Sequence, residues 1–262
     1  MKVSKVNLIY YSPTGASKKI VESVAKGLGI TGLEYIDLTH LDAASKNYLI
    51  PADSLAVFGV PVYGGRVPPI AAQRLRKVRG NGTPAVIMAV YGNRAIEDAL
   101  IELKDITTEQ GFKAIAGAAF IGEHSFSNIT TPLSQGRPDA EDLKKATRFG
   151  EQMKKIMGNE VPSEVNVPGN RPYRERNPSG QRAPETTPEA CTLCGACEKV
   201  CPTKAIKVTE KVETTKESCT SCSACVKACP TGARVWKNEG VKKAAVWLHT
   251  EYSKRREPEL FI

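Results

Sequence analysis

The sequence predicts an α/β protein: a doubly wound, five-stranded parallel sheet followed by a small α+β domain. Buried-strand patterns alternate with amphipathic helical patterns over residues 1–158, as in sheets that are covered by helices on both faces. All eight cysteines lie between Cys191 and Cys229, so the second part has a different organising principle. We therefore expect a first domain over 1–158, a linker or strap over 159–188, a cysteine-rich domain over 189–240, and a C-terminal helix and tail over 241–262.

Five apolar runs have the length of buried strands, and they span 3–11, 33–38, 55–60, 84–91 and 112–121. Between them, apolar residues recur at helical spacing. They form two apolar faces, Ile20, Val21, Val24, Ala25 and Leu28 in the first helix and Ile96, Ala99, Leu100 and Leu103 in the third, and a last helix covers 139–157. Parallel strands need such crossover connections, so this order predicts the doubly wound sheet.

In sheets of this kind, ligands bind beyond the carboxyl ends of the strands at the topological switch point. The first strand is followed by Ser12, Pro13, Thr14, Gly15, Ala16 and Ser17. Hydroxyls and free backbone N–H groups at a helix N-terminus form a phosphate site. The loop is neither a P-loop nor a G-x-G-x-x-G fingerprint. A simple helix cap by Ser12 or Thr14 explains the same residues.

The loops after the third and fourth strands pair an aromatic residue with glycine. They contain Pro61, Val62, Tyr63, Gly64, Gly65 and Arg66, and Tyr91, Gly92, Asn93 and Arg94. A planar ring could stack on Tyr63 or Tyr91 while backbone groups approach its edge. Turn chemistry alone also accounts for the Tyr-Gly pairs, but three consistent loops at one edge of the sheet favour a ligand site.

The S-x-T-G-x-S loop, together with the two later loops, resembles the FMN site of flavodoxins. The resemblance covers the first domain. It implies that Ser12, Thr14, Gly15, Ala16 and Ser17 hold the FMN phosphate, and that 61–65 and 91–94 border the isoalloxazine. Ala16 and Ser17 stand where Asn and Thr are common, so a side-chain amide is missing. Arg66 and Arg94 depart further, and an arginine near the ring should make full reduction easier.

The cysteines form an internal duplication. The segments 191–208, CTLCGACEKVCPTKAIKV, and 219–236, CTSCSACVKACPTGARVW, align without gaps at a period of 28 residues. Each has the spacing C-x2-C-x2-C-x3-C-P of bacterial two-cluster ferredoxins, in which the fourth cysteine binds the other cluster. The predicted ligands are therefore Cys191, Cys194, Cys197 and Cys229 for one [4Fe–4S] cluster, and Cys219, Cys222, Cys225 and Cys201 for the other.

Structural zinc and disulfides are the alternatives to iron–sulfur clusters. Zinc sites use paired C-x2-C units with a longer spacer, which leaves the third cysteine and the Cys-Pro of each repeat unexplained. Disulfides need an oxidising compartment, and no signal peptide is visible. We therefore expect a soluble, cytoplasmic protein whose second domain resembles a two-cluster ferredoxin. Six lysines accompany the cysteines and should raise the cluster potentials: Lys199, Lys204, Lys207, Lys211, Lys216 and Lys227.

The formal net charge of +9 raises the prior for nucleic-acid binding. Two clusters with their thiolates add a charge of about −4, which lowers the net charge of the protein to about +5. The basic residues are also scattered along the sequence without interleaved aromatics. We expect no nucleic-acid partner and no membrane span, because no run approaches the ~18 apolar residues that a span needs. An acidic protein partner or a negatively charged cofactor explains the excess of basic over acidic residues.

A flavodoxin-like domain followed by a two-cluster ferredoxin domain resembles the flavoferredoxin-type iron–sulfur flavoproteins of anaerobes. This resemblance implies electron transport between the clusters and FMN, with an external ferredoxin or another redox protein as partner. The alternative is an FMN-dependent oxidoreductase that reduces a small-molecule acceptor. An NAD(P)H oxidoreductase is disfavoured because a second dinucleotide-binding unit is missing. A homodimer remains open.

His124 follows the fifth strand and is the candidate catalytic residue, since an unperturbed imidazole can deliver a proton near neutral pH. A packing histidine is the alternative. The linker over 159–188 is rich in Pro, Gly and charge. It forms a flexible tether or an ordered strap, and Tyr173 favours the strap. The C-terminal helix, predicted over 241–256, offers Val246, Trp247 and Tyr252 for docking.

Overall fold

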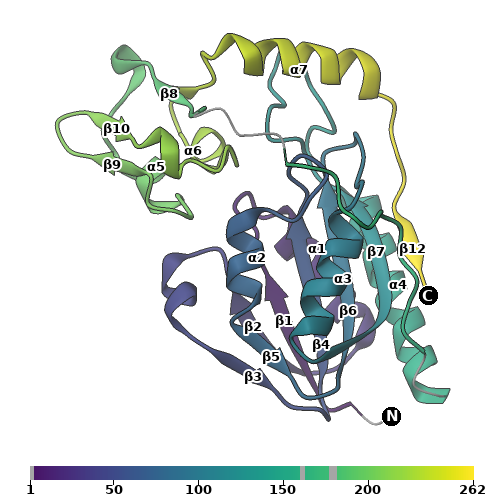
Figure 1. Cartoon of the computed structure of the whole chain (residues 1–262). Coiled ribbons are helices and arrows are strands. Elements are labelled where there is room, and N and C mark those ends of the chain that lie inside the picture. Colours follow the sequence, from purple (N-terminus) through teal and green to yellow (C-terminus); the bar gives the residue numbers. More distant parts are fainter. Residues whose placement is uncertain (1–2, 160–162, 177–181) are drawn as a thin grey trace.

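The computed structural model describes residues 3–159, 163–176 and 182–262 (Figure 1). The first domain is built on a six-stranded sheet in the order β12-β7-β6-β4-β1-β2. Its five parallel strands are β1 (Lys5–Tyr10), β2 (Gly32–Asp37), β4 (Leu55–Pro61), β6 (Thr83–Tyr91) and β7 (Phe112–Ile121). This order is the flavodoxin-like form of the doubly wound fold. The predicted fold class is therefore confirmed.

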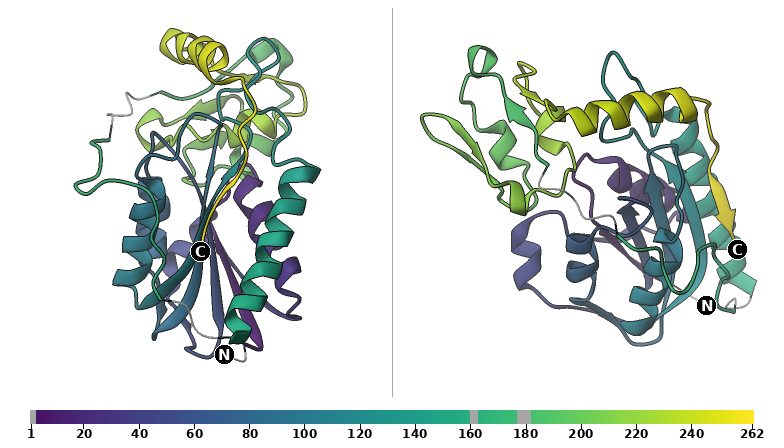
Figure 2. Two further views of the ribbon diagram at one scale, coloured as in Figure 1. Left: turned by 90° about the vertical axis from the view of Figure 1, so that its right-hand side faces the viewer. Right: turned by 45° about the horizontal axis from the view of Figure 1, so that its top comes forward.

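Alternate residues of the strands point to opposite faces of the sheet, and each face is covered by two helices (Figure 2). On one face, α1 (Ala16–Leu28) and α4 (Ala140–Asn159) pack on Leu8, Val57 and Met88. On the other face, α2 (Pro69–Leu75) and α3 (Ala99–Glu109) pack on Ile9, Phe58 and Ile87. Both cores are apolar, as the sequence pattern required.

The helices α1 and α4 are in backbone contact because two glycines face each other across their interface. A Cβ atom on Gly27 would lie 1.9 Å from the carbonyl oxygen of Thr147, and one on Gly150 would lie 2.1 Å from that of Val24. Any larger residue at either position would push the helices apart. The close contact fixes the C-terminal half of α1, the helix that follows the first switch-point loop, against α4.

Three short elements of the first domain were not predicted. The strands β3 (Tyr48–Ile50) and β5 (Val78–Gly80) form a separate parallel pair. The strand β12 (Glu259–Phe261) adds to the main sheet antiparallel to β7. Each is only three residues long, too short to carry a periodic signal.

The cysteine-rich domain is small and lies beyond the carboxyl edge of the sheet (Figure 1). It contains two short antiparallel pairs, β8 (Glu185–Thr186) with β11 (Arg234–Val235) and β9 (Ile206–Val208) with β10 (Val212–Thr214). Two one-turn helices, α5 (Ala196–Lys199) and α6 (Ala224–Lys227), each contain the third cysteine of a repeat. Short 3₁₀ helices cover Pro188–Ala190 and Lys216–Ser218 in this domain, and a third covers Leu41–Ser45 in the first domain.

Residues 163–176 of the predicted linker form a strap along α3, whereas Asn159 ends α4 and Glu185–Thr186 form β8 of the cysteine-rich domain. The backbone N–H of Val165 donates to Ala114 at 2.9 Å, and Tyr173 and Arg171 both bind the carboxylate of Asp105. Asn170 bonds to Asp98 through its backbone N–H at 2.8 Å. The rest of the predicted linker, 160–162 and 177–181, lies outside the described residues.

The C-terminal helix α7 (Glu239–Tyr252) crosses above the loops at the carboxyl edge of the sheet (Figures 1 and 2). It begins with Asn238, whose side chain accepts from the N–H of Val241. It starts two residues before and ends four residues before the prediction, and the tail then descends beside β7 to form β12. Among the described residues, no helix combines the length and apolar character of a membrane span.

Candidate functional site

The three predicted loops and the loop after β7 meet at the carboxyl edge of the sheet around one cavity of ≈ 60 Å³, here called the loop cavity. Its lining includes Ser12, Pro13, Thr14, Ala16 and Ser17 of the first loop, Pro61, Val62 and Tyr63 of the second, Tyr91 and Gly92 of the third, and Glu123, His124 and Ser125 after β7. A neighbouring cavity of ≈ 380 Å³, the roof cavity, shares Val62, Tyr91, Gly92 and His124 with it. Together they form one hollow at the switch point.

The first loop leaves a hydroxyl without a partner. Ser17 is 1 % exposed, and its Oγ has no hydrogen-bond partner among the described residues although it lines the loop cavity. Buried hydroxyls are normally paired. The helix N-terminus adds a positive partial charge at the same place. The loop therefore fits an anionic, hydrogen-bond-accepting ligand such as a phosphate.

The helix-cap alternative is only partly realised. The N-cap of α1 is Gly15, which has a left-handed backbone with φ 85°, and neither Ser12 nor Thr14 occupies that position. Ser12 acts from outside the helix, because its Oγ accepts from the N–H of Lys18 at 3.0 Å. Its own N–H donates to Thr39 at 2.8 Å. Ser12 thus fixes the loop and leaves Ser17 free to bind.

Tyr63 and Tyr91 both line the loop cavity with unionised phenols. Burial raises the pKa of Tyr63 well above its ordinary value, and burial also raises that of Tyr91. A Cβ atom on Gly92 would lie 2.5 Å from the ring of His124, so a glycine lets the imidazole pack against the third loop. The two phenol rings are uncharged and flat, which suits contact with a planar ligand.

The structure places two predicted residues elsewhere. Arg66 forms a bidentate ion pair with Glu102. Its guanidinium also stacks on Tyr173, with the central carbon 4.4 Å from the centroid of the ring. Asn93 holds the C-terminal tail by donating to the carbonyl groups of Tyr252 and Lys254. Neither side chain lines the two cavities, so both brace the loops from behind. Their roles depend on segments far away in the sequence, which a local pattern does not reveal.

Arg94 does line the roof cavity, but its charge is shared. Its guanidinium binds Glu97 through two hydrogen bonds of 2.9 and 2.7 Å. Arg174 of the strap binds the same carboxylate and lines the same cavity. Two arginines with one glutamate leave a single net positive charge, which is weaker than the free arginines that the sequence analysis expected at a flavin ring.

His124 lines both cavities as a neutral imidazole. Burial, and secondarily the charge of Arg94, lower its pKa to about 4. Its Nδ1 accepts from the N–H of Phe126 at 3.0 Å, which places the proton on Nε2. At neutral pH the side chain can therefore donate a hydrogen bond from Nε2. The expected delivery of a proton by an imidazolium near neutral pH does not agree with this environment.

Sequence reasoning missed the roof of the hollow. Trp247 and Leu248 of α7 line the roof cavity together with Phe126 and Arg174. The sequence analysis named Trp247 only as a docking residue. The helical pattern could indicate that it faces something, but its partner lies more than a hundred residues away in the chain. The helix is fixed there because His249 contacts the carbonyl oxygen of Pro132 at 2.7 Å.

All eight cysteines are free thiols, so the disulfide alternative is not realised. The structure brings Cys191, Cys194, Cys197 and Cys229 to the wall of one small cavity. In the ranges that the structure describes, no three His, Cys, Asp or Glu side chains are arranged to hold a single metal ion.

The other four cysteines also lie together. Burial raises the pKa of Cys219 and Cys225, and the nearby thiol of Cys201 raises both further. Burial raises that of Cys222 to about 12, again with Cys219 and Cys225 among the neighbours. Cys201 of the first repeat therefore lies near Cys219 and Cys225 of the second.

Polar groups point at the sulfur atoms. The N–H of Ala205 donates to Cys201 Sγ at 3.2 Å, and the hydroxyls of Thr203 and Thr231 lie 3.7 Å from Cys201 Sγ and Cys229 Sγ. Hydrogen bonds to the sulfur atoms help to set the reduction potentials of thiolate-bound clusters. The donor sets therefore fit iron–sulfur clusters.

The second cysteine group contacts the first domain. Cys222 lines the loop cavity beside the switch-point loops. The domain contact is maintained by an ion pair of Lys227 with Glu123 and by a hydrogen bond of 2.7 Å from Arg74 to the carbonyl oxygen of Pro202. Any group bound in the hollow would thus lie next to a predicted cluster ligand.

Comparison with known proteins finds similarities for separate parts of the chain. A family described as "4Fe-4S dicluster domain" matches residues 190–233. A comparison with curated proteins finds no match. Similar solved structures include a flavodoxin from the domain Archaea (12% identity, 59% of this chain and 99% of that chain, TM-score 0.38) and a Streptococcus pneumoniae TIGR4 flavodoxin (16%, 57% and 97%, TM-score 0.39). Another is the Flv1 flavodiiron core of Synechocystis (17%, 59% and 36%, TM-score 0.41).

The assignment of the first domain to the flavodoxin-like fold rests on its strand order. The chain thus joins a flavodoxin-like α/β domain to a segment of the 4Fe–4S dicluster type.

Proposed function

We propose that this protein relays electrons between two [4Fe–4S] clusters and an FMN held in the hollow of the first domain. The observation that carries the proposal is the position of Cys222, which belongs to the second cysteine group and also lines the loop cavity. Electron transfer between two centres needs them to be close, and this cysteine belongs to both sites.

Each cysteine group supplies one set of ligands. Cys191, Cys194, Cys197 and Cys229 hold the outer cluster, and Cys219, Cys222, Cys225 and Cys201 hold the inner cluster. The exchange of the fourth cysteine between repeats follows the ferredoxin pattern. It is supported by Cys229 lining the cavity of the first group and by the effect of Cys201 on Cys219 and Cys225.

FMN suits the hollow better than other anionic ligands because the two cavities differ in character. Ser17 and the N-terminus of α1 bind the phosphate at the loop cavity. Tyr91 and Trp247 border the ring in the larger roof cavity, and Tyr63 borders it from the loop cavity. The flavin supplies two-electron chemistry, whereas each cluster passes one electron at a time.

The two clusters of the relay differ in their exposure to solvent. The direction of electron flow between them is not fixed by this difference. Cys194 of the outer group is exposed, whereas Cys222 of the inner group is only 8 % exposed. An external one-electron protein therefore exchanges electrons at the outer cluster. Lys199 and Lys204 are exposed in this domain, so an acidic partner such as a ferredoxin is favoured.

A second function, reduction of a small acceptor, is favoured by the roof cavity itself. The helix α7 covers the hollow, so a second protein would not reach the flavin directly. His124 can donate a hydrogen bond from Nε2, and the group of Arg94, Arg174 and Glu97 carries one net positive charge. These groups would orient a small, planar, electron-accepting molecule at the flavin.

Cofactor analysis and anaerobic stopped-flow spectroscopy test the proposal. The purified protein should contain about eight iron atoms, as two [4Fe–4S] clusters require, and about one FMN. A reduced ferredoxin should bleach the clusters first and the flavin afterwards. Folded protein that holds full iron but binds no flavin would refute the relay. Turnover of small acceptors by the reduced protein distinguishes the second function from the first.

A further inference from the structure

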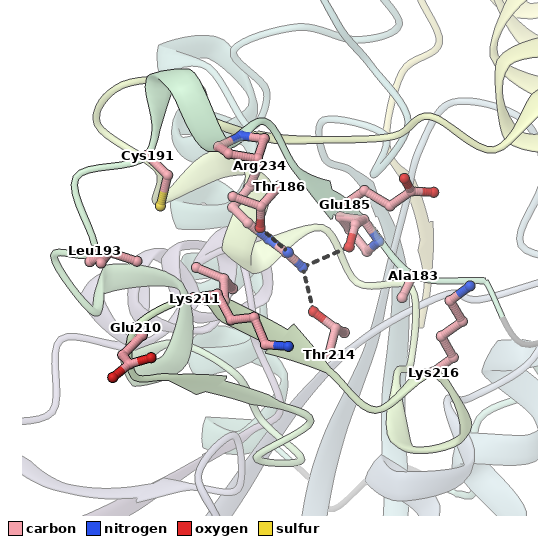
Figure 3. A pocket seen from close by; sticks show the side chains of 13 residues that line it. Ala183, Glu185, Thr186, Cys191, Leu193, Glu210, Lys211, Thr214, Lys216 and Arg234 are labelled. Atoms are coloured by element: carbon pink, nitrogen blue, oxygen red, sulfur yellow. Dashed lines mark hydrogen bonds between the residues drawn. The ribbon is translucent and has the colours of Figure 1, made fainter.

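Arg234 is a buried cation in the cysteine-rich domain. It lies on β11 and is 2 % exposed. Its guanidinium donates to Thr186 Oγ1 at 2.8 Å, to the carbonyl oxygen of Pro184 at 2.8 Å, and to Thr214 Oγ1 at 3.1 Å (Figure 3). These acceptors are all neutral. The Nε atom is buried without a hydrogen-bond partner among the described residues.

The charge of Arg234 has no carboxylate partner. Within the described ranges, no Asp or Glu forms an ion pair with it. Glu185 and Glu210 line the same cavity of ≈ 490 Å³, yet both are exposed, and Figure 3 shows no contact from either carboxylate to the guanidinium. A guanidinium stays protonated in proteins. A buried charge without compensation is strongly unfavourable, so a counter-charge is expected nearby.

The two cysteine groups supply that counter-charge. Nη2 of Arg234 lies 3.9 Å from Sγ of Cys225, a ligand of the inner cluster. The same side chain lines the small cavity formed by Cys191, Cys194, Cys197 and Cys229, which are the ligands of the outer cluster. One guanidinium therefore faces both sites.

The internal repeat shows that packing alone does not require an arginine here. At the period of 28 residues, the first repeat has Ile206 where the second has Arg234. Ile206 is buried and packs with Cys197 and Cys225. An apolar side chain is thus accommodated at the equivalent position, and the charge of Arg234 needs an explanation of its own.

We infer that Arg234 is a counter-charge shared by both clusters, and that it makes each cluster easier to reduce. A cluster with four thiolates carries a charge of about −2, and reduction by one external electron takes it to about −3 without forming or breaking a bond. A fixed positive charge stabilises the more negative state. The inference rests on the cluster half of the proposed function and is independent of the flavin.

The test is a potentiometric titration of the whole holoprotein, with each cluster followed by its EPR signal. Arg234→Gln removes the charge, and Arg234→Ile copies the residue of the first repeat. At a fixed potential, either variant should lower the ratio of reduced to oxidised cluster by at least about tenfold for both clusters, which is a shift of about 59 mV for one electron. Arg234→Lys keeps the charge and should change the ratio by less than about threefold.

Lys211→Gln is the matched control, because this exposed lysine lines the same cavity and is paired with Glu213 at 3.0 Å. Its effect should be small and should vanish at high salt, while that of Arg234→Gln should persist.

Three results would overturn the inference: unchanged potentials in both neutral variants, a shift of one cluster alone, or a fall in Arg234→Lys as large as in Arg234→Gln. If the neutral variants lose their clusters, Arg234→Lys is compared with the unchanged protein, and a fall of about tenfold or more in its ratio of reduced to oxidised cluster would overturn the inference. Iron and sulfide analysis separates these outcomes from failure of the proposed function, since a protein without two clusters fails there first.

Discussion

The two cysteine repeats have the same spacing but different surroundings. Cys194 and Cys222 are equivalent at the period of 28 residues, yet the first is exposed and the second is buried against the loop cavity. Lys199 and Lys227 are likewise equivalent, but among the residues that the structure describes only Lys227 forms an ion pair with the first domain. The duplication supplied two similar sites, and docking against the flavodoxin-like domain made one inner and one outer.

The difference indicates that long-range contact, rather than the motif, assigns the roles. Both repeats contain the ligands of a cluster, and nothing in their cysteine spacing says which one faces the flavin. The inner repeat differs by the contacts of Lys227, Cys222 and Trp236, whose ring meets that of Phe126 at 5.3 Å. Four pairs of variants test whether the inner and outer ends of the relay differ in this way.

The largest effect is expected from the equivalent cysteines themselves. Cys222→Ser should impair the inner cluster and slow flavin reduction by a reduced ferredoxin by at least the roughly 10–100-fold that is typical even of second-shell changes at metal sites. The outer cluster should still be reduced at a near-normal rate. Cys194→Ser should instead slow the first electron-transfer step. Stopped-flow traces of clusters and flavin measure both steps, and equal behaviour of the two variants would contradict the inner and outer assignment.

The inner end should also be sensitive to acid because His124 is held neutral there. Its pKa falls from an ordinary value near 6.5 to about 4 on folding. The unfolded chain therefore binds a proton that the folded chain does not. Stability should decrease as the pH falls from about 6.5 toward 4, by about 1–3 kcal/mol. Below about 4 this contribution levels off.

Denaturant unfolding across this pH range measures the effect. His124→Asn should remove most of the slope, whereas His40→Gln, at an exposed position, should leave it unchanged. A slope that survives in His124→Asn would assign the acid sensitivity to other groups.

Much of this architecture could be predicted from the sequence because the signals are local. Five buried strands and the repeated cysteine spacing appear as continuous patterns, and so do the three loops at the switch point. The structure fixed what those patterns cannot contain. Arg66 pairs with Glu102, and Asn93 binds the tail. Trp247 lines the roof cavity, and β12 adds a strand of only three residues to the edge of the sheet. Each depends on a contact between distant segments.

The roof over the inner end can be tested with neighbouring residues of α7. Both side chains are about half exposed, but only Trp247 lines the roof cavity. If the indole covers the flavin ring, Trp247→Ala should weaken FMN binding by about 0.5–1.5 kcal/mol, or roughly twofold to thirteenfold. Val246→Ala should have no effect. Fluorescence titration of the flavin-free protein with FMN gives both constants, and equal affinities in the two variants would remove Trp247 from the site.

The smallest effect is expected at the equivalent lysines, which should separate docking within the chain from docking with a partner. Lys227→Gln removes the ion pair with Glu123 and should weaken the domain contact by about 0.5–1 kcal/mol, since such half-exposed pairs contribute little. Hydrogen exchange in residues 122–127 should then increase. Lys199→Gln, without an ion pair among the described residues, should leave exchange unchanged but slow reduction by an acidic ferredoxin at low salt, because surface charges act mainly on association rates. If Lys199→Gln loosens the domain contact or Lys227→Gln alone slows the ferredoxin, the partner docks on the inner repeat instead.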